Sequence, residues 1–395
     1  MMKRLLQINV CSNVLSTGKI CEDIAKVSQN AGWDTYIVYN SNGKPSVSNE
    51  IPIGSKANKF FHYLQYRLFD NEGLNSQKQT KYLLRRIEEI MPDIIHLHNI
   101  HDHWLNYPLL FNYIADRNIP VVWTQHDCWA FTGGCMYFDF SNCERWKNGC
   151  VGCLERRGLL VKNRARKNFE LKKLLIEKIP SITFVPVSNW LGDLMKQSVQ
   201  KNRPIITIHN GVDISRFRPA TSIAKTKFKV IGVAAVWDAR KGLDDFIKLR
   251  NILPSEIDII LVGLTSKQIE SLPKGFVGIC RTSSVEELVQ LYSDADVFVN
   301  PTYADNFPTT NIEALACGTP VITYKTGGSP EAIDEETGVV VEQGNLTALA
   351  EAILRIKEEP LSSETCRKRA VLYFDKDKSF KQYLNIYNEL INKNE

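Results

Sequence analysis

The strongest constraint on the fold is a regular alternation between short apolar, β-branched runs and longer segments in which apolar residues recur at helical spacing. Parallel strands need crossover connections of a dozen or more residues, and these are usually helices. The alternation therefore predicts an α/β fold with doubly wound parallel sheets, whose ligand crevices lie at the carboxyl ends of the strands. The predicted strands span residues 5–10, 35–39, 94–97, 120–124, 183–187, 205–208, 229–235, 258–262, 275–280, 296–300, 321–324 and 338–341.

The strand rhythm restarts after the turn sequence Asn-Gly-Val-Asp at residues 210–213, and a short polar connector follows at 221–227. A chain of 395 residues is long enough for two domains with full hydrophobic cores. We therefore expect one α/β domain over residues 1–209 and a second over residues 210–374. Apolar residues between 379 and 390 recur at helical spacing, which predicts a helix near the C-terminus.

Most of the chemical information lies in residues 301–322, which read PTYADNFPTTNIEALACGTPVI and place Asp305 and Glu313 eight positions apart across a predicted loop-to-helix junction. Thr310 is expected to cap a helix that Gly318 ends. The free N–H groups and positive dipole end of this helix suit an anion such as a nucleotide diphosphate. Glu313 could then accept hydrogen bonds from ribose hydroxyls, and Asp305 could reach a sugar. The alternative is that Thr310 and Glu313 form a capping box with no binding role.

This stretch resembles the acid-x7-acid region of retaining nucleotide-sugar glycosyltransferases, the GT-B enzymes of the family 4 type (glycosyltransferase group 1) that act in bacterial exopolysaccharide, capsule and lipopolysaccharide assembly. That family usually has Glu first, and Asp305 stands in its place here, one methylene shorter. The resemblance implies two Rossmann-like domains that face a cleft: an acceptor-side domain at 1–209, a nucleotide-sugar domain at 210–374, and a helix at 375–395 that returns to the first domain. Further matches lie near residues 16–20, 96–104, 126–153, 188–191, 210–217, 237–242 and 327–331.

A cationic pair, Arg240 and Lys241, follows the predicted strand at residues 229–235 and precedes a predicted helix. Such cations can neutralise a diphosphate leaving group as charge develops on it. The resembled family commonly has an Arg six residues before this Lys, and Ala235 occupies that position here, so Arg240 would supply the second cation. The alternative is an exposed Arg-Lys pair that only opens a helix.

The resemblance implies further donor contacts in both halves of the chain. A Gly-Gly-Ser-Pro-Glu loop follows the strand at 321–324, and successive glycines let backbone N–H groups approach a phosphate closely. In the first domain, a loop ending at residues 16–20 would face the transferred sugar and the acceptor; it is not a dinucleotide GxGxxG motif, which argues against NAD. The implied donor-binding residues are Gly18, Asn306, Phe307, Thr309, Thr310, Gly327, Gly328 and Glu331.

Five of the seven histidines lie close together in the sequence, at His96, His98, His101, His103 and His126. Their spacing at a strand end could ligate a catalytic metal, but no Asp/Glu spacing completes a hydrolase metal set. The resemblance instead puts His96 and His98 on the acceptor side. It puts His126 beside the transferred sugar, where this ring could donate to a sugar hydroxyl. We therefore expect no catalytic metal.

A cysteine cluster lies inside an insert at residues 128–155, with Cys135, Cys143, Cys150 and Cys153 falling within nineteen residues. In a reducing compartment, clustered thiolates in a long loop suit a closed tetrahedral Zn²⁺ site that stabilises the loop and has no catalytic vacancy. A subgroup of the resembled family carries such an insert after its His-Asp pair, where it would form a wall of the acceptor pocket. Reduced thiols without metal and a stress disulfide are the alternatives.

The formal net charge of +5 is concentrated in residues 156–178, which hold nine Lys/Arg against Glu170 and Glu177. Apolar residues at helical spacing predict a basic amphipathic helix there, and such a helix can rest on an anionic membrane. The alternative is a solvated helix packed by its apolar stripe. The sequence shows neither a signal-peptide pattern nor a run of eighteen apolar residues, so we expect a cytoplasmic protein that could lie peripherally on the inner face of the plasma membrane.

Together these features predict a retaining glycosyltransferase that moves a sugar from a nucleotide diphosphate sugar to a hydroxyl of a glycan or lipid-linked oligosaccharide. The resemblance implies a same-face mechanism in which the departing diphosphate accepts the proton of the acceptor. The alternatives are a nucleotide-sugar epimerase or hydrolase on the same fold, and a zinc-stabilised nucleic-acid-binding protein. A nucleic-acid-binding function would leave residues 301–331 unexplained, so we expect no nucleic-acid partner. The predicted catalytic residues are His126, Arg240, Lys241, Asp305 and Glu313.

Overall fold

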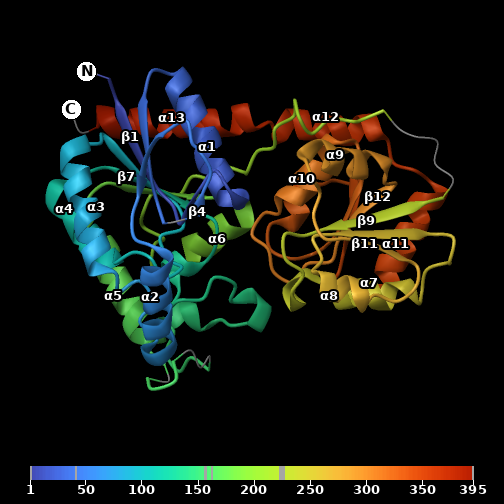
Figure 1. Ribbon diagram of the computed structural model, residues 1–395, viewed down its shortest axis with the longest axis horizontal. Coiled ribbons are helices and arrows are strands. Elements are labelled where there is room, and N and C mark those ends of the chain that lie inside the picture. The colour runs from blue at the N-terminus through green and yellow to red at the C-terminus, as the bar shows by residue number, and fades with distance from the viewer. Residues whose placement is uncertain (1, 41, 155–157, 162, 222–226, 394–395) are drawn as a thin grey trace. The chain divides into compact units, whose positions relative to one another are not determined.

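The computed structural model describes residues 2–40, 42–154, 158–161, 163–221 and 227–393 (Figure 1). The chain divides into two compact units, one of Met1–Ile208 with Phe380–Glu395 and the other of His209–Ser379. Each unit holds a six-stranded sheet in which neighbouring strands are parallel. The predicted α/β class with two doubly wound parallel sheets is therefore confirmed.

The sheet of the first unit has the strand order β5-β3-β1-β6-β7-β8. Leu5 of β1 pairs with Thr35 of β3 on one side and with Ile94 of β6 on the other. The strand order reverses between β1 and β6, so the ligand crevice expected of such a sheet lies at the carboxyl ends of these two strands. The strands are β1 Arg4–Ile8, β2 Cys11–Ser12, β3 Asp34–Tyr39, β4 Asn42–Gly43, β5 Asn49–Pro52, β6 Ile94–Leu97, β7 Val121–Gln125 and β8 Ile182–Pro186.

Local sequence explains where several helices of the first unit begin. The side chains of Ser55, Asn106 and Ser188 each accept a backbone N–H and cap α2, α4 and α6. The last helix, α13, lies against this unit in Figure 1, and its residues Phe380 and Tyr387 are buried in the core with residues of β1 and α1. The helices are α1 Leu15–Asn30, α2 Lys56–Phe69, α3 Gln77–Ile90, α4 Tyr107–Arg117, α5 Ala165–Glu177, α6 Asn189–Gln197 and α13 Lys376–Asn392.

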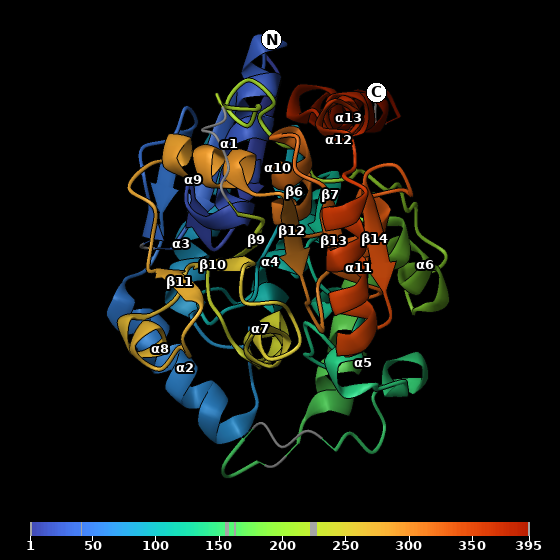
Figure 2. The ribbon, with the colours of Figure 1, turned by 90° about the vertical axis from the view of Figure 1, so that its right-hand side faces the viewer.

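The second unit has the strand order β11-β10-β9-β12-β13-β14, which reverses between β9 and β12. Figure 2 shows β12, β13 and β14 side by side with α11 along them. The strands are β9 Lys229–Val233, β10 Asp258–Val262, β11 Phe276–Ile279, β12 Val297–Asn300, β13 Val321–Tyr324 and β14 Gly338–Val341. The helices are α7 Leu243–Arg250, α8 Ser266–Glu270, α9 Val285–Asp294, α10 Thr309–Ala316, α11 Leu346–Glu358 and α12 Ser363–Tyr373.

Two edge segments of the first unit differ from the prediction. Residues 205–208 run beside β8 but form only an isolated bridge, between Ile205 and Phe184. Backbone hydrogen bonds join this segment to Phe184 on both sides, but Pro186 has no N–H with which to continue the ladder. The predicted strand is therefore reduced to a bridge. Conversely, the sequence does not predict β5, because Ile51 is the one buried residue of this edge strand.

Candidate active site

Three of the predicted site segments lie at one edge of the sheet in the second unit. They follow β9, β12 and β13, which are neighbours in the sheet and run parallel, so the loops at 234–242, 301–308 and 325–331 leave from the same edge. The first two loops flank the point where the strand order reverses. Doubly wound sheets bind their ligands at this position.

The loops after β9 and β12 meet through an ion pair between Lys241 and Asp305, whose Nζ and Oδ2 atoms lie 2.5 Å apart. Both side chains are largely shielded, with 21% and 16% of their surface exposed. Arg240 donates from Nη1 to the carbonyl of Ala304 at 2.9 Å, so it holds the loop that carries Asp305. The structure thus brings three predicted residues together and gives Lys241 a carboxylate partner that the sequence did not indicate.

The loop after β12 is held in place by a hydrogen bond to a buried carboxylate. Asp245 accepts hydrogen bonds from the hydroxyl groups of Tyr303 at 2.8 Å and Tyr324 at 2.7 Å. Burial and the Asp245 carboxylate raise the pKa of Tyr303 to about 12, so this hydroxyl stays protonated. Gly242 has a φ of 75°, and a Cβ there would lie 2.2 Å from the carbonyl oxygen of Pro301. The close approach of the two loops therefore requires glycine at this position.

Glu313 lies in α10, but not in its first turn. The helix begins at Thr309, and its N-cap residue Pro308 makes no side-chain hydrogen bond to it. Thr310 is already inside the helix, so the predicted Thr310 cap and capping box are wrong: proline, with its fixed φ, starts the helix earlier. Glu313 is half-buried and accepts a hydrogen bond from the hydroxyl of Tyr292 at 3.3 Å. Burial and the Glu313 carboxylate raise the pKa of Tyr292, which keeps this hydroxyl a donor.

The glycine loop after β13 carries a pair that the sequence patterns did not indicate. Gly327 has a φ of 52°, and Gly328 leads into a short 3₁₀ turn that contains Glu331. Oε2 of Glu331 lies 2.7 Å from Nε2 of His209, and the ring of Phe307 stands 4.9 Å from the His209 ring. His209 stands directly before the Asn-Gly turn at the unit boundary, and this position is the sequence signal that could have pointed to a role for His209.

Buried amides connect the loops to α10. Asn300, at the end of β12, donates to Oδ1 of Asn311 at 2.8 Å, and Asn311 donates to the carbonyl of Ser329 at 3.3 Å. Asn306 is also buried, with 3% of its surface exposed. Within the described residues, the buried hydroxyl of Ser329 has no hydrogen-bond partner. Asn311 therefore ties the strand end, the helix and the glycine loop into one rigid group.

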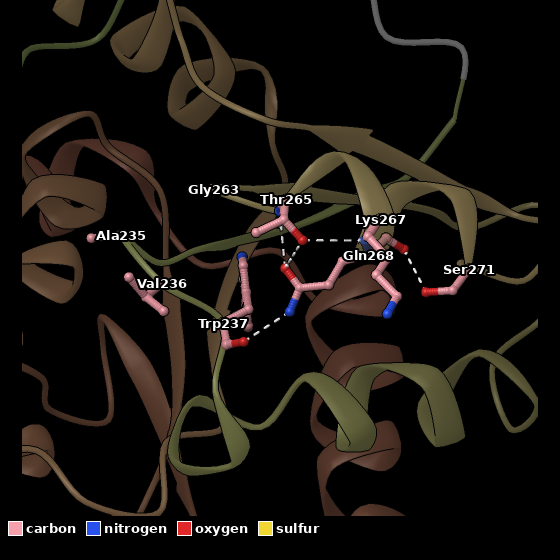
Figure 3. A pocket seen from close by; sticks show the side chains of 8 residues that line it. All are labelled: Ala235, Val236, Trp237, Gly263, Thr265, Lys267, Gln268 and Ser271. Atoms are coloured by element: carbon pink, nitrogen blue, oxygen red, sulfur yellow. Dashed lines mark hydrogen bonds between the residues drawn. The ribbon is translucent and has the colours of Figure 1, made fainter.

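A pocket of about 330 Å³ opens at the carboxyl ends of β9 and β10 (Figure 3). The indole N–H of Trp237 donates to the carbonyl of Val262 at 2.9 Å, and Gln268 donates to the carbonyl of Trp237 at 2.8 Å, so its walls are fixed. Gly263 has a φ of 98°, and a Cβ there would lie 1.7 Å from the carbonyl oxygen of Ala234. The sequence did not indicate this pocket, which is lined by Ala235, Val236, Trp237, Gly263, Thr265, Lys267, Gln268 and Ser271.

In the first unit, His126 ends a hydrogen-bonded chain. Its Nε2 lies 3.1 Å from Nδ1 of His98, and Nε2 of His98 lies 3.2 Å from Oε1 of Gln7. The amide nitrogen of Gln7 donates to the carbonyl of Cys21 at 2.9 Å, so Oε1 of Gln7 accepts from His98. Burial lowers the pKa of His98 and lowers that of His126 to about 4, so both rings are neutral. His98 then accepts at Nδ1 from the Nε2–H of His126, and the role of His126 beside the transferred sugar stays a prediction.

The two histidines predicted for the acceptor side are interior. His96 is fully buried, with Nε2 at 2.7 Å from the hydroxyl of Thr124 and Nδ1 at 2.6 Å from the hydroxyl of Tyr387. His98 is likewise bonded at both ring nitrogens. Their contacts within this unit therefore stabilise the sheet and hold His126.

A buried ion pair lies next to His126 in the sequence. Nε2 of His101 and Oδ2 of Asp127 are 2.8 Å apart, and Oδ1 of Asp127 accepts the N–H of Trp129 at 2.8 Å. Burial alone would lower the pKa of His101, but the Asp127 carboxylate raises it to about 9. A cationic His101 thus lies close to a neutral His126 at neutral pH. The alternative histidine metal set does not form: across the described part of the chain, no three His, Cys, Asp or Glu side chains are grouped to hold a metal.

The cysteine insert is held by aromatic packing. The rings of Phe138 and Trp146 lie 5.0 Å apart, and those of Phe131 and Trp146 lie 5.3 Å apart. Sγ of Cys150 accepts the backbone N–H of Gly133 at 3.1 Å, and burial raises the pKa of Cys150 to about 11. Zinc ligation needs several thiolates at one point. The structure does not support the predicted zinc site. Among the described residues, no three side chains of the set Cys135, Cys143, Cys150 and Cys153 lie close enough together to hold a metal ion.

The basic segment at 156–178 is only partly helical, because α5 begins at Ala165. Lys172 is buried; it donates to the carbonyl of Trp129 and lies 3.9 Å from the centre of its ring. The predicted basic helix therefore covers only part of the segment, and the charge of Lys172 is turned inward. The cations Arg156, Arg157 and Lys162 lie outside the described residues.

Gly18 lies in the first turn of α1 and not at the end of a loop as predicted. Its carbonyl accepts the N–H of Asn13 at 3.2 Å, and a Cβ at this position would lie 3.1 Å from Sγ of Cys11. The structure thus explains the glycine by close packing, and its donor-binding role stays a prediction.

Two protein-family models match the chain. The model described as Glycosyltransferase Family 4 matches residues 18–216, which is half of the chain, and the model described as Glycosyl transferases group 1 matches residues 213–372.

Curated relatives include a colanic acid biosynthesis glycosyl transferase, WcaC, of Escherichia coli. It is 22% identical over 416 residues, which cover 98% of this chain and all of the relative. An N,N'-diacetylbacillosaminyl-diphospho-undecaprenol alpha-1,3-N-acetylgalactosaminyltransferase of Campylobacter jejuni is 26% identical over 56% of this chain and 63% of its own length.

Solved structures share the fold. Sucrose-phosphate synthase from Thermosynechococcus elongatus superposes with a TM-score of 0.73 at 18% identity, covering 99% of this chain and 100% of that one. Anabaena HepE in complex with UDP superposes with a TM-score of 0.67 at 15% identity, covering 98% of this chain and 100% of that one.

Proposed function

Since this chain belongs to Glycosyltransferase Family 4, we propose that it transfers a sugar from a nucleotide diphosphate sugar to a glycan or lipid-linked oligosaccharide in bacterial surface polysaccharide assembly. The relatives named for colanic acid biosynthesis and for a diphospho-undecaprenol acceptor support this acceptor class. The HepE complexes with UDP and UDP-glucose support a nucleotide-sugar donor.

The observation that carries the proposal is the Lys241–Asp305 pair at the point where the strand order of the second unit reverses. We assign Lys241 to the leaving diphosphate, because an ammonium group shielded from solvent stabilises phosphate charge more than one in water. Asp305 would accept hydrogen bonds from hydroxyls of the donor sugar while it orients Lys241. Arg240, which holds the Ala304 carbonyl, would act by positioning this loop.

The remaining donor contacts surround this pair. Glu313 would bind the ribose hydroxyls, supported by its half-buried place on α10 and its hydrogen bond from Tyr292. The backbone of Gly327 and Gly328 would face the phosphates, and the pocket beside Trp237 would accept the base. Asn306, Phe307, Thr309, Thr310 and Glu331 stay proposed donor-side residues.

The proposed chemistry is retention by same-face transfer. The acceptor hydroxyl attacks the anomeric carbon on the face from which the diphosphate departs, and the departing diphosphate takes the hydroxyl proton. No protein nucleophile is needed, so the protein's part is orientation and charge stabilisation. His126, held by His98, would line the sugar near the reacting centre.

A panel of UDP-, GDP- and ADP-sugars tests this function. We expect one class of nucleotide sugar to raise the melting temperature of the protein and to be slowly hydrolysed without acceptor. When a lipid-linked acceptor is added, the donor should be consumed faster, and the transferred sugar should keep the anomeric configuration that it has in the donor. An epimerase would instead convert the donor sugar without acceptor. Failure of every nucleotide sugar to stabilise the protein or to turn over would remove the transferase proposal.

A further inference from the structure

Helix α2 is an amphipathic helix that is turned outward. Of its fourteen residues only His62 is buried. Phe60 and Phe61 have 59% and 62% of their surface exposed, and Leu64 has 43% exposed. Large aromatic side chains normally bury most of their surface in a folded unit, and contiguous exposed apolar groups mark interaction sites.

The exposed apolar residues share one face of α2. Leu64 lies four residues after Phe60 and three after Phe61, so the three side chains are neighbours on the helix surface. The opposite face is the anchor: Nδ1 of His62 lies 2.8 Å from the hydroxyl of Ser76, and its Nε2 accepts the N–H of Gly73 at 3.1 Å. The helix is therefore fixed to its unit by a polar contact while its apolar face is left in water.

A second exposed apolar segment is bonded to the C-terminal end of α2. The N–H groups of Leu159 and Leu160 donate to the carbonyls of Arg67 and Leu68 at 2.8 and 2.9 Å, at the C-terminal end of α2. Leu159 and Leu160 have 57% and 68% of their surface exposed, and the following Val161 has 39%. In Figures 1 and 2, α2 extends away from the sheet of its unit, with this segment near its far end. We call Phe60, Phe61, Leu64, Leu159 and Leu160 the α2 patch.

The charged residues of α2 itself are all positive. α2 contains Lys56, Lys59 and Arg67 and no acidic residue. Lys59 pairs with Asp102 at 2.5 Å, whereas Lys56 and Arg67 take part in none of the ion pairs found among the described residues. Lys56 lies four residues before Phe60 and Arg67 three after Leu64, so cations border the apolar face at both ends of the helix.

We propose that the α2 patch docks this protein on the surface of an anionic lipid bilayer, with the aromatic and leucine side chains in the interfacial layer and the two cations at the lipid head groups. An apolar face bordered by cations is the pattern of helices that lie in a membrane interface. Apolar burial and charge attraction together supply the two signals that stable membrane attachment needs. None of the helices in the described part of the chain has the length and apolar character to cross a bilayer, so attachment here is at the surface.

This surface moves the membrane contact from the basic helix α5 to α2 and to Leu159 and Leu160, which lie near the start of the segment at 156–178. On α5 Lys172 faces inward, whereas Phe60, Phe61 and Leu64 of α2 face outward. A second copy of the chain is the other occupant an apolar face could have. The cations at both ends of the face favour lipid, because two copies meeting through this face would bring like charges together.

Vesicle flotation with the full chain tests the proposal. Wild type is mixed with vesicles of phosphatidylcholine alone and of phosphatidylcholine with phosphatidylglycerol, without donor or acceptor. We expect binding to the anionic vesicles and at least about tenfold weaker binding to the neutral ones. The double variant F60S/F61S should bind anionic vesicles at least about tenfold more weakly than wild type. K56Q/R67Q should lose the preference for anionic lipid.

The matched control is M91S/L372S, which removes two apolar side chains of similar exposure, 66% and 60%, that are not part of the α2 patch. It should bind vesicles like wild type, and all variants should keep the wild-type circular dichroism and melting temperature. Binding of F60S/F61S equal to wild type, or no binding of wild type to anionic vesicles, would overturn the proposal. A wild-type dimer that F60S/F61S converts to monomer, without vesicle binding, would assign the patch to a second copy. Because no donor is present, each of these results leaves the proposed transfer reaction untouched.

Discussion

Replacing Asp127 by Asn should remove a pH-dependent part of the stability of the first unit. In the folded chain Asp127 raises the pKa of the buried His101 from 6.5 to about 9. At about 1.4 kcal/mol per pH unit, this shift corresponds to about 3 kcal/mol of stabilisation. Asn keeps the size of the side chain: its carbonyl oxygen can still accept the N–H of Trp129, and its Nδ2 can donate to Nε2 of a neutral His101, so the change mainly removes the charge.

The sign follows from proton uptake. Below pH 6.5 His101 is protonated in both the folded and the unfolded chain, and the full contribution is present. Between pH 6.5 and about 9 only the folded chain holds the proton, so the free energy of unfolding falls as pH rises, and above about 9 the contribution is lost. The difference in free energy of unfolding between wild type and D127N should therefore shrink by about 3 kcal/mol from pH 6 to 9.5.

Urea unfolding followed by tryptophan fluorescence across this pH range measures the difference. D102N is the control, because Asp102 pairs with Lys59 and has 46% of its side chain exposed, so its removal should leave most of the pH dependence in place. Parallel pH profiles for wild type and D127N would show that His101 is not held protonated by Asp127, and the electrostatic description of the histidine group would be wrong.

Three further predictions concern other residues. Glu313→Gln keeps an acceptor for the Tyr292 hydroxyl but removes the charge, so donor turnover should fall at least about a hundredfold with an unchanged melting temperature; steady-state kinetics with the identified donor would contradict this if turnover stayed within twofold. Gln7→Leu removes the acceptor that sets the tautomer of His98, so kcat should fall about tenfold while the KM for the donor stays unchanged. If the affinity for the donor also fell about tenfold, the effect of the substitution would be merely structural. Gly263→Ala should destabilise the second unit by several kcal/mol, because the new Cβ would lie 1.7 Å from a carbonyl oxygen. Gly32→Ala is the control: its φ is a similar 82°, but a Cβ there would have no atom within 4 Å, so it should cost only about 1 kcal/mol. Equal melting temperatures for the two variants would refute the steric argument.

Several strands were predictable from their apolar, mostly β-branched runs. The predicted bounds of β6, β10, β13 and β14 coincide with the observed ones, because apolar, mostly β-branched runs in a parallel sheet depend little on their neighbours. Residues 205–208 failed because their pairing depends on Pro186 in another segment. Thr310 failed as a cap because Pro308, two residues earlier, is the competing helix start.

The candidate site was predictable as a set of local motifs but not as a geometry. Asp305 and Lys241 each lie in a recognisable sequence motif, yet their ion pair joins residues 64 positions apart and depends on β9 lying beside β12. The cysteine spacing suggested zinc because sequence spacing does not show that aromatic rings fill the insert. The exposed apolar face of α2 was not predicted either: spacing gives the face of a helix, and only the fold shows whether anything covers it.

Donor affinity in a Lys241→Met variant is the most direct measurement of the proposed donor site. With the nucleotide sugar that the panel identifies, calorimetry should give wild-type binding and at least about tenfold weaker binding for K241M, because the shielded ammonium beside Asp305 is lost. K357M, which removes an ion-paired lysine on α11 of the same unit, should bind the donor like wild type. Equal affinity of wild type and K241M would contradict the placement of the diphosphate at this edge of the sheet.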